Sequence, residues 1–311
     1  MSETRKRKIH IPRHDLKSFV LFAAVHLAAL LTVLAIVFII GYILVKGIPN
    51  LTPELFERRY TSENVSLFPA LVNTLLITLL SLLFAVPVGI GAAIYLTEYA
   101  RHGGMQLSGA SGEGRKGISS YLAVCENKLV GIVEVTAETL SGIPSIVYGL
   151  FGSLFFVKYL GFGLSLLSGA LTLSIMILPL IMRTTQEALK AVPDSYREGS
   201  FGLGAGKLRT VFSIVLPCAV PGILSGVILG IGRIIGESAA LIFTAGTVAE
   251  TASGIFSSAR TLSVHMYAIS GEGLYIDQTY ATAVVLLVVV ILINGLSGFV
   301  AKRIGGGHTD G

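Results

Sequence analysis

Residues 19–45 read FVLFAAVHLAALLTVLAIVFIIGYILV and contain no Asp, Glu, Lys or Arg. About 20 consecutive apolar residues are enough for a helix to cross the hydrocarbon core of a bilayer. The apolar core of a signal peptide is shorter, about 7–15 residues, and no A-x-A-like cleavage site follows this stretch. The stretch therefore predicts a retained membrane-spanning helix, and the chain is predicted to be an integral membrane protein.

Five further stretches are long and apolar enough to span a membrane. They are 67–96, 129–157, 159–182, one span within 211–245, and 280–301. The composition agrees, because 53% of the residues are hydrophobic, only 13% are charged and the mean hydropathy is +0.78, whereas soluble domains average about 25% charged residues. We expect an all-α fold with about six transmembrane helices.

The distribution of Lys and Arg predicts the orientation of these spans. The segments 1–18, 101–128, 183–209 and 302–303 hold 17 of the 23 basic residues, and the alternate segments hold five. Cytoplasmic loops carry the excess of Lys and Arg, so both termini are predicted to be cytoplasmic in a multi-pass protein of the cell membrane. The net charge of +5 then reflects orientation in the bilayer, and no nucleic-acid partner is expected.

The inner segment 197–217 reads REGSFGLGAGKLRTVFSIVLP. A short helix over 198–203, capped by Asp194 or Ser195, a turn at Gly204 and a second helix from Lys207 are predicted. The chain has no G-x-x-x-x-G-K-[ST] loop for ATP. Energy from ATP would have to arrive through contact with another protein, and a protruding helix pair is suited to that contact.

This segment resembles the coupling loop of binding-protein-dependent importers of the ATP-binding cassette class, which follows E-A-A, three residues, G, nine residues, I-x-L-P. The matching positions, with Gly-Ser in place of two alanines, are Glu198, Gly199, Ser200, Gly204, Ile214, Leu216 and Pro217. The resemblance implies a type I importer permease fold and no enzyme activity in this chain. It also implies an ATPase dimer that binds ATP and Mg²⁺, a second permease and an extracytoplasmic binding protein.

Longer segments indicate the solute. Residues 68–100, 138–152, 178–205 and 232–246 resemble the permeases of the high-affinity phosphate importer, and GRIIGES with ALIFTAG is more similar to its A-type than to its C-type permease. The resemblance implies that the partners are a C-type permease and a phosphate-binding protein. Alternatives are the C-type permease itself and a permease for molybdate, sulfate or phosphonate. An ion-gradient-driven secondary transporter would leave the coupling loop unexplained and would normally show inverted repeats.

Three charged residues are candidates for the solute pathway. Arg233 and Glu237 are four residues apart, so on a continuous helix they share one face and can pair, and charges inside a span usually face a protein interior or a water-filled path. A guanidinium suits phosphate oxygens, and the resemblance ties both positions to transport. Arg183 is a further candidate, at the inner end of the fourth span. No metal or catalytic site is expected, because the six histidines and two cysteines show no ligand pattern.

The predicted organisation has three parts. Residues 1–66 form the cytoplasmic N-terminus, the first span and an outer loop. Residues 67–303 form the importer transmembrane domain, with the coupling loop at 193–217. Residues 304–311 form a short cytoplasmic tail.

Overall fold

The computed structural model describes residues 16–100 and 118–305, which form helices joined by turns and contain no strand. The first part comprises α1 (Leu16–Gly47), η1 (Ile48–Asn50), η2 (Pro53–Phe56), α2 (Phe68–Ile94) and the π-helical turn η3 (Tyr95–Ala100). The central part comprises α4 (Ile118–Ser141), α5 (Ser145–Gly152), η4 (Ser153–Tyr159) and α6 (Leu166–Lys190). The last part comprises α7 (Asp194–Gly202), α8 (Lys207–Thr210), η5 (Val211–Val215), α9 (Leu216–Gly236), α10 (Ala239–Thr244), α11 (Leu262–Glu272) and α12 (Ile276–Gly305).

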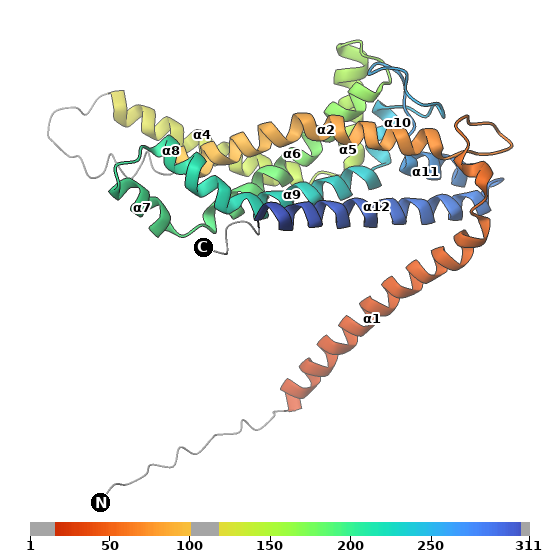
Figure 1. Cartoon of the computed structure of the whole chain (residues 1–311), viewed down its shortest axis with the longest axis horizontal. Coiled ribbons are helices and arrows are strands. Elements are labelled where there is room, and N and C mark those ends of the chain that lie inside the picture. The colour runs from red at the N-terminus through yellow and green to blue at the C-terminus, as the bar shows by residue number, and fades with distance from the viewer. Residues whose placement is uncertain (1–15, 101–117, 306–311) are drawn as a thin grey trace, which may run out of the picture.

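The long helices α2, α6, α9 and α12 run side by side in one bundle (Figure 1). Helices α7 and α8 and the C-terminal end of α12 lie at one end of it, and α10 and α11 lie toward the other. In the described residues, five helices are long and apolar enough to cross a membrane, or six if the bent pair Val130–Ser141 and Ser145–Tyr159 counts as one span. The prediction of about six membrane helices is therefore confirmed.

Two predicted spans are placed differently by the structure. The third is not one continuous helix, because the chain bends by 106° between Ser141 and Ser145. Pro144 lies in this break with an extended backbone (ψ 141°), and a proline disfavours helical conformation in the residue before it. The fourth predicted span begins at Leu166 rather than at 159, and its helix continues to Lys190. The start of this helix is capped by Ser165, whose Oγ accepts a hydrogen bond from the backbone N–H of Ser168.

The bundle core lies between α2, α6 and α9. Glycines on α9 face α6 at four-residue spacing: a methyl group at Gly226 would collide with Thr184 Oγ1, and at Gly222 it would lie 2.6 Å from Ala188 Cβ. Small residues at this spacing let membrane helices approach closely. The Ser174 hydroxyl donates to the Ser81 carbonyl (2.9 Å) and so joins α6 to α2.

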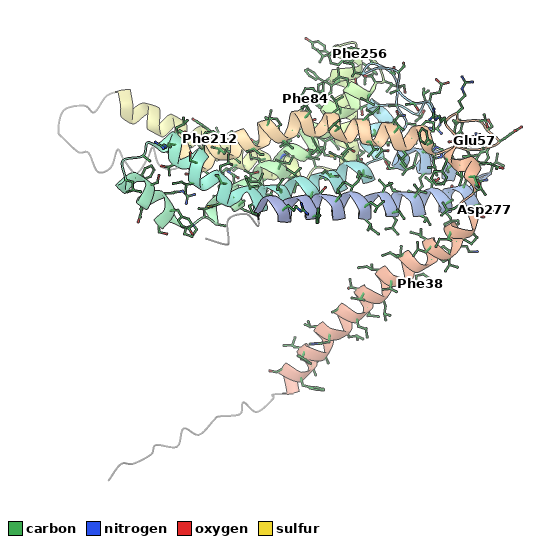
Figure 2. All side chains as sticks on the ribbon, viewed as in Figure 1. Phe38, Glu57, Phe84, Phe212, Phe256 and Asp277 are labelled. Atoms are coloured by element: carbon green, nitrogen blue, oxygen red, sulfur yellow. The ribbon has the colours of Figure 1, made fainter. Side chains whose placement is uncertain are left out.

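Apolar side chains also cover the outside of the helices. Figure 2 shows Phe38 on α1 and Phe84 on α2 pointing away from the helix axes, whereas the acidic Glu57 and Asp277 lie together at one end of the bundle. Helix α1 leaves the bundle at this end and contacts α12 there, where Gly47 lies against the Tyr280 backbone. Exposed apolar surface of this extent is expected where a helix faces lipid or another membrane helix.

Candidate functional site

The segment that resembles a coupling loop forms two short helices joined by a tight turn. Helix α8 begins at Lys207, as the sequence predicted, whereas α7 begins at Asp194, earlier than the predicted start at Glu198, and ends at Gly202 rather than Leu203. Gly204 has φ +83°, a left-handed conformation that glycine adopts without strain. The expected side-chain cap is absent from α7, which begins directly after Pro193. The Asp194 carboxylate instead accepts a hydrogen bond from Arg197 Nη1 at 3.1 Å.

The two small residues of the motif have different surroundings. Gly199 is exposed, and a side chain there would meet no atom within 4 Å. Ser200 is buried, and its hydroxyl lies 2.8 Å from the Thr210 hydroxyl, which joins α7 to α8. The departure from alanine at position 200 is therefore used for a hydrogen bond between the two helices.

The outer surface of this helix pair is apolar. Five large side chains of α7, α8 and their flanks are exposed: Tyr196, Phe201, Leu203, Leu208 and Phe212. Leu203, next to the turn, is 91% exposed. Of the other motif positions, Glu198 lies on α7, Ile214 lies in η5, and Leu216 and Pro217 open α9. Because α8, η5 and α9 form one helical span from Lys207 to Gly236, the loop leads directly into the membrane.

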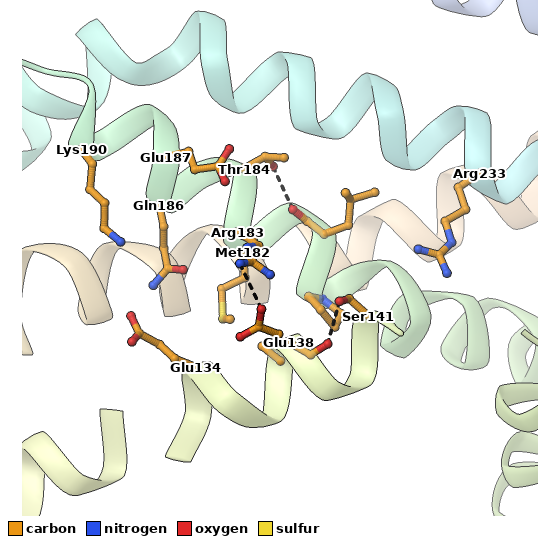
Figure 3. A pocket seen from close by; sticks show the side chains of 13 residues that line it. Glu134, Glu138, Ser141, Met182, Arg183, Thr184, Gln186, Glu187, Lys190 and Arg233 are labelled. Carbon is orange, nitrogen blue, oxygen red and sulfur yellow. Dashed lines mark hydrogen bonds and ion pairs between the residues drawn. The ribbon is translucent and has the colours of Figure 1, made fainter. Parts of the chain in front are cut away.

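A cavity of about 520 Å³ lies between α4, α6 and α9. Its wall contains Arg233 of α9 together with Arg183 of α6, so the structure brings two of the three predicted pathway residues to one space (Figure 3). Its other charged residues are Glu134, Glu138, Glu187 and Lys190. Three basic and three acidic side chains thus face the same cavity.

The charges in this cavity are unequally paired. Arg183 Nη2 lies 3.5 Å from Glu138 Oε1 across the α4–α6 interface. Arg233 makes no hydrogen bond or ion pair with any residue in 16–100 or 118–305. It also borders a second cavity of about 630 Å³, whose other polar side chains are Ser225 and Asn294. An unpaired guanidinium beside a cavity is suited to bind an anion.

Glu237 lies apart from this arrangement. Helix α9 ends at Gly236, and Glu237 has an extended backbone (ψ 126°), so the expectation that Arg233 and Glu237 share one helix face is wrong. The Glu237 carboxylate accepts the backbone N–H of Ala240 (3.0 Å), and its carbonyl accepts the Ser263 hydroxyl (2.5 Å). The four-residue rule failed because it assumes that the helix continues.

Glu98 and Arg197 were not singled out from the sequence, although both are buried and paired beside the coupling loop, with 2.7 Å between Arg197 Nη2 and Glu98 Oε1. The available signals were an acidic residue at the inner end of the second span and an arginine directly before the motif. Neither signal indicates that the two residues meet, because they are 99 positions apart.

The comparisons with known proteins agree with this geometry. Residues 117–306 match the family described as "Binding-protein-dependent transport system inner membrane component". The chain is 29% identical over 286 residues to the probable ABC transporter permease protein YqgI of Bacillus subtilis, covering 86% of this chain and 89% of the relative. It is 31% identical over 242 residues to the phosphate transport system permease protein PstA 1 of Mycobacterium tuberculosis, covering 76% of this chain and 71% of the relative.

Solved importers share the fold. A bacterial alginate ABC transporter, crystallised with a periplasmic protein carrying an alginate pentasaccharide, contains a chain with a TM-score of 0.60 and 17% identity, over 93% of this chain and 98% of that one. The MetNI methionine ABC transporter in an inward-facing conformation gives a TM-score of 0.51 and 18% identity, over 85% and 97%. The fold is therefore that of type I importer permeases.

Proposed function

The chain belongs to the family of binding-protein-dependent transport system inner membrane components, and we propose that the solute it moves into the cell is inorganic phosphate. The observation that carries the proposal is the Arg233 guanidinium, which has no hydrogen-bond or ion-pair partner among the described residues and borders the cavity between α4, α6 and α9. Charged groups at membrane depth are costly and mark solute paths. A guanidinium offers a planar fork of donors that fits two phosphate oxygens.

The names of several relatives support this solute. Relatives 30–34% identical, from Mycobacterium tuberculosis, Mycobacterium leprae and Xylella fastidiosa, are named phosphate transport system permease protein PstA. These names favour the A-type role over the C-type, although a relative named PstC is also similar, at 26% identity. The alginate and methionine transporters share only the fold at less than 20% identity, so they do not bear on the solute.

The proposed pathway uses charged residues that line one cavity. Phosphate delivered from the outer side first meets Arg233, whose guanidinium has no hydrogen-bond or ion-pair partner in the described part of the chain. Arg183 lies in the same wall and forms an exposed ion pair with Glu138, with 3.5 Å between Nη2 and Oε1. An anion reaching Arg183 competes with the Glu138 carboxylate, and the carboxylate returns when the anion leaves. This exchange keeps the anion from binding too tightly to be released.

Energy enters at the coupling helices. The exposed apolar side chains of α7 and α8 form the surface proposed to dock on an ATPase dimer, which binds ATP and Mg²⁺. A second, C-type permease would complete the pathway, and an extracytoplasmic phosphate-binding protein would deliver the anion. We propose a multi-pass protein of the cell membrane with both termini in the cytoplasm. In this proposal, ATP binding to the ATPase dimer opens the paired permeases toward the outside, and ATP hydrolysis returns them to the inward-facing state.

The test is uptake by the complete complex in proteoliposomes, with Arg233→Lys and Arg233→Gln compared with the wild-type chain. The matched control is Arg303→Gln, which removes an exposed arginine near the C-terminal end of α12. Loss of a charge-assisted contact is expected to lower labelled phosphate uptake about tenfold in Arg233→Gln, with a smaller loss in Arg233→Lys and none in the control. Unchanged uptake in both Arg233 variants would contradict the role of Arg233. If the complex took up sulfate or molybdate but did not take up phosphate, that anion would be identified as the solute instead.

A further inference from the structure

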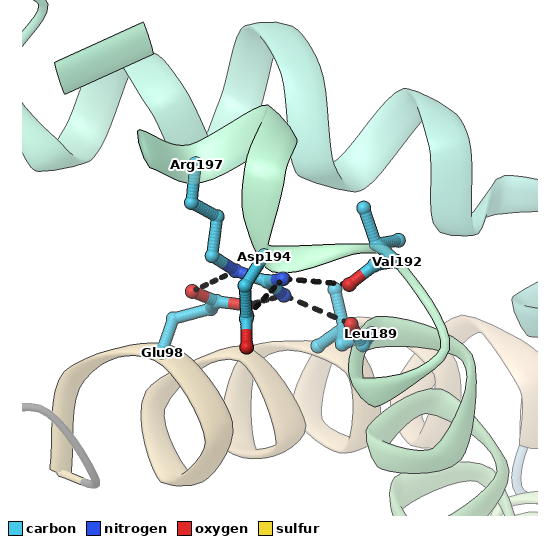
Figure 4. Close-up of polar contacts among 5 residues, drawn as sticks. All are labelled: Glu98, Leu189, Val192, Asp194 and Arg197. Atoms are coloured by element: carbon cyan, nitrogen blue, oxygen red, sulfur yellow. Dashed lines mark hydrogen bonds and ion pairs between the residues drawn. The ribbon is translucent and has the colours of Figure 1, made fainter. Parts of the chain in front are cut away.

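Arg197 lies on α7, but its side chain is buried and points toward Glu98, beside Leu189 and Val192 (Figure 4). It makes five hydrogen bonds. Nε and Nη2 donate to the two Glu98 oxygens at 3.3 and 2.7 Å, Nη2 also donates to the Leu189 carbonyl at 2.9 Å, and Nη1 donates to the Val192 carbonyl at 2.8 Å and to Asp194 at 3.1 Å. A guanidinium has five N–H donors, so its donor capacity is filled.

These contacts join three elements at one point. Glu98 belongs to η3 at the end of the α2 span, Leu189 belongs to the last turn of α6, and Arg197 belongs to α7. Both charged side chains are buried, with 8% of the Arg197 side chain and 3% of the Glu98 side chain exposed. A buried ion pair gives little net stability compared with apolar packing. The pair therefore requires another explanation, and a fixed geometric connection is one that its contacts provide.

The two coupling helices need different connections to the membrane. Helix α8 continues through η5 into α9, so a movement of α8 reaches Arg233 through one continuous helical span. Helix α7 follows α6 through only residues 191–193, and its backbone is extended at Pro193 (ψ 137°). Without a further contact, α7 would move with α8, to which the Ser200–Thr210 hydrogen bond joins it, and would leave α6 in place.

The contacts of Arg197 prevent α7 from moving without α6. Helix α6 runs from this point along the cavity, and it contributes Lys190, Gln186 and Arg183 to the cavity wall. Helix α2, which continues into η3 and Glu98, packs along α6 more extensively than any other pair of described helices. A displacement of α7 is thus passed to both helices, and packed helices respond to small shifts by moving between discrete arrangements.

We propose that the Arg197–Glu98 pair is the connection that passes movement of α7 to α6 and α2, and so opens and closes the cavity. Arg197 is a positioning residue that acts through these helices and does not touch the solute. The proposal rests on the proposed coupling to an ATPase, but it does not depend on which solute is carried.

The test measures how accessible the cavity is to a maleimide reagent. Ser141, which borders the cavity, is changed by S141C in a chain whose own cysteines are removed by C125S and C218S. The complex with its ATPase and second permease is reconstituted, and maleimide labelling is measured with and without ATP plus vanadate. Nucleotide trapping is expected to change the labelling rate several-fold in this background. With R197K or E98Q added, most of that change is lost, although the complex still forms and hydrolyses ATP, and phosphate imported per ATP falls about tenfold.

A matched variant examines the exposed contact of the same arginine. Asp194 is 85% exposed, so D194N, which keeps an oxygen acceptor, is expected to retain at least half of the nucleotide-dependent change. The proposal is overturned if R197K and E98Q complexes keep the full change in labelling. It is equally overturned if these variants only form fewer complexes, each with normal import per ATP. A wild-type complex that changes labelling with nucleotide but imports no phosphate would refute the proposed solute and leave this connection standing.

Discussion

Gly204 is a single residue on which the shape of the coupling loop depends. Its φ is +83°, in the left-handed region. A residue with a side chain, such as valine, would adopt this conformation at a cost of roughly 1–2 kcal/mol. We expect Gly204→Val to distort the turn between α7 and α8 and to lower ATP-driven uptake severalfold at normal protein levels. Gly206→Val is the control, because Gly206 has φ −74° and open space around its Cα. Equal uptake by the two variants would show that the turn geometry is unimportant.

His265 on α11 predicts a pH dependence of stability. Burial and the nearby charge of Arg260 lower the pKa of His265 from 6.5 to about 4, and α11 is not among the membrane-spanning helices. The unfolded chain therefore takes up a proton near pH 6.5, whereas the folded chain does so only near pH 4. The folded state is expected to lose up to about 3 kcal/mol as the pH falls from 6.5 to 4, and nothing from this group above 6.5.

The measurement is the free energy of unfolding of the purified permease at pH 7.5 and pH 5. His265→Phe keeps a ring that can contact Tyr60, whose centroid lies 6.0 Å from the imidazole, and removes the titrating group. A wild-type chain whose stability falls no more than that of His265→Phe between these two pH values would contradict the prediction.

Residues differ in how far the sequence alone predicts them. The turn at Gly204 could be predicted, because glycine at a fixed distance from Glu198 and Pro217 is a local requirement. The Arg197–Glu98 pair could not be predicted, because its partners come from different spans and no spacing rule relates them. The pairing of Arg183 with Glu138 depends equally on how α4 packs against α6.

At the scale of elements, α6 and α9 approach closely where Gly226 faces Thr184. Gly226→Leu would place a large side chain where a methyl group already collides with Thr184, and overpacking of this kind costs typically 1–3 kcal/mol. We expect a lower thermal midpoint and loss of uptake. Gly91→Leu on α2 is the control, since a methyl group there meets no atom within 4 Å. A Gly226→Leu chain as stable and active as Gly91→Leu would show that α6 and α9 can separate without cost.

Elements were predicted well where apolar length decides them and less well where a break does. The first, second and last spans follow from uncharged apolar stretches. The bend at Pro144 and the end of α9 at Gly236 depend on local breakers combined with tertiary contacts, such as the Ser263 hydroxyl on the Glu237 carbonyl. Hydropathy does not detect such breaks, because the residues on both sides remain apolar.

At the scale of the whole molecule, the bent pair α4–α5 determines which side of the membrane each later helix reaches. If Val130–Tyr159 crosses the bilayer, α6 returns to the side on which α2 ended, and α7 and α8 lie with the N-terminus. If the pair entered and left on one side, α7 and α8 would lie on the opposite face, whereas the 2.7 Å contact between Arg197 on α7 and Glu98 at the end of the α2 span puts them on the side where that span ended. A coupling loop works only where ATP is present, and the excess of Lys and Arg in 183–209 favours the cytoplasm. We therefore expect the bent pair to cross.

Single cysteines in a C125S and C218S chain test this topology with a membrane-impermeant maleimide on intact cells. Lys158→Cys, in the exposed turn η4, is expected to react from outside. Arg209→Cys, on α8, is expected to react only after permeabilisation. Lys46→Cys is the control, because it precedes the bent pair and lies outside in both topologies. The reverse pattern at positions 158 and 209, with Lys46→Cys still labelled, would place the coupling helices away from ATP. It would then contradict both the crossing of α4–α5 and the ATPase contact that depends on it.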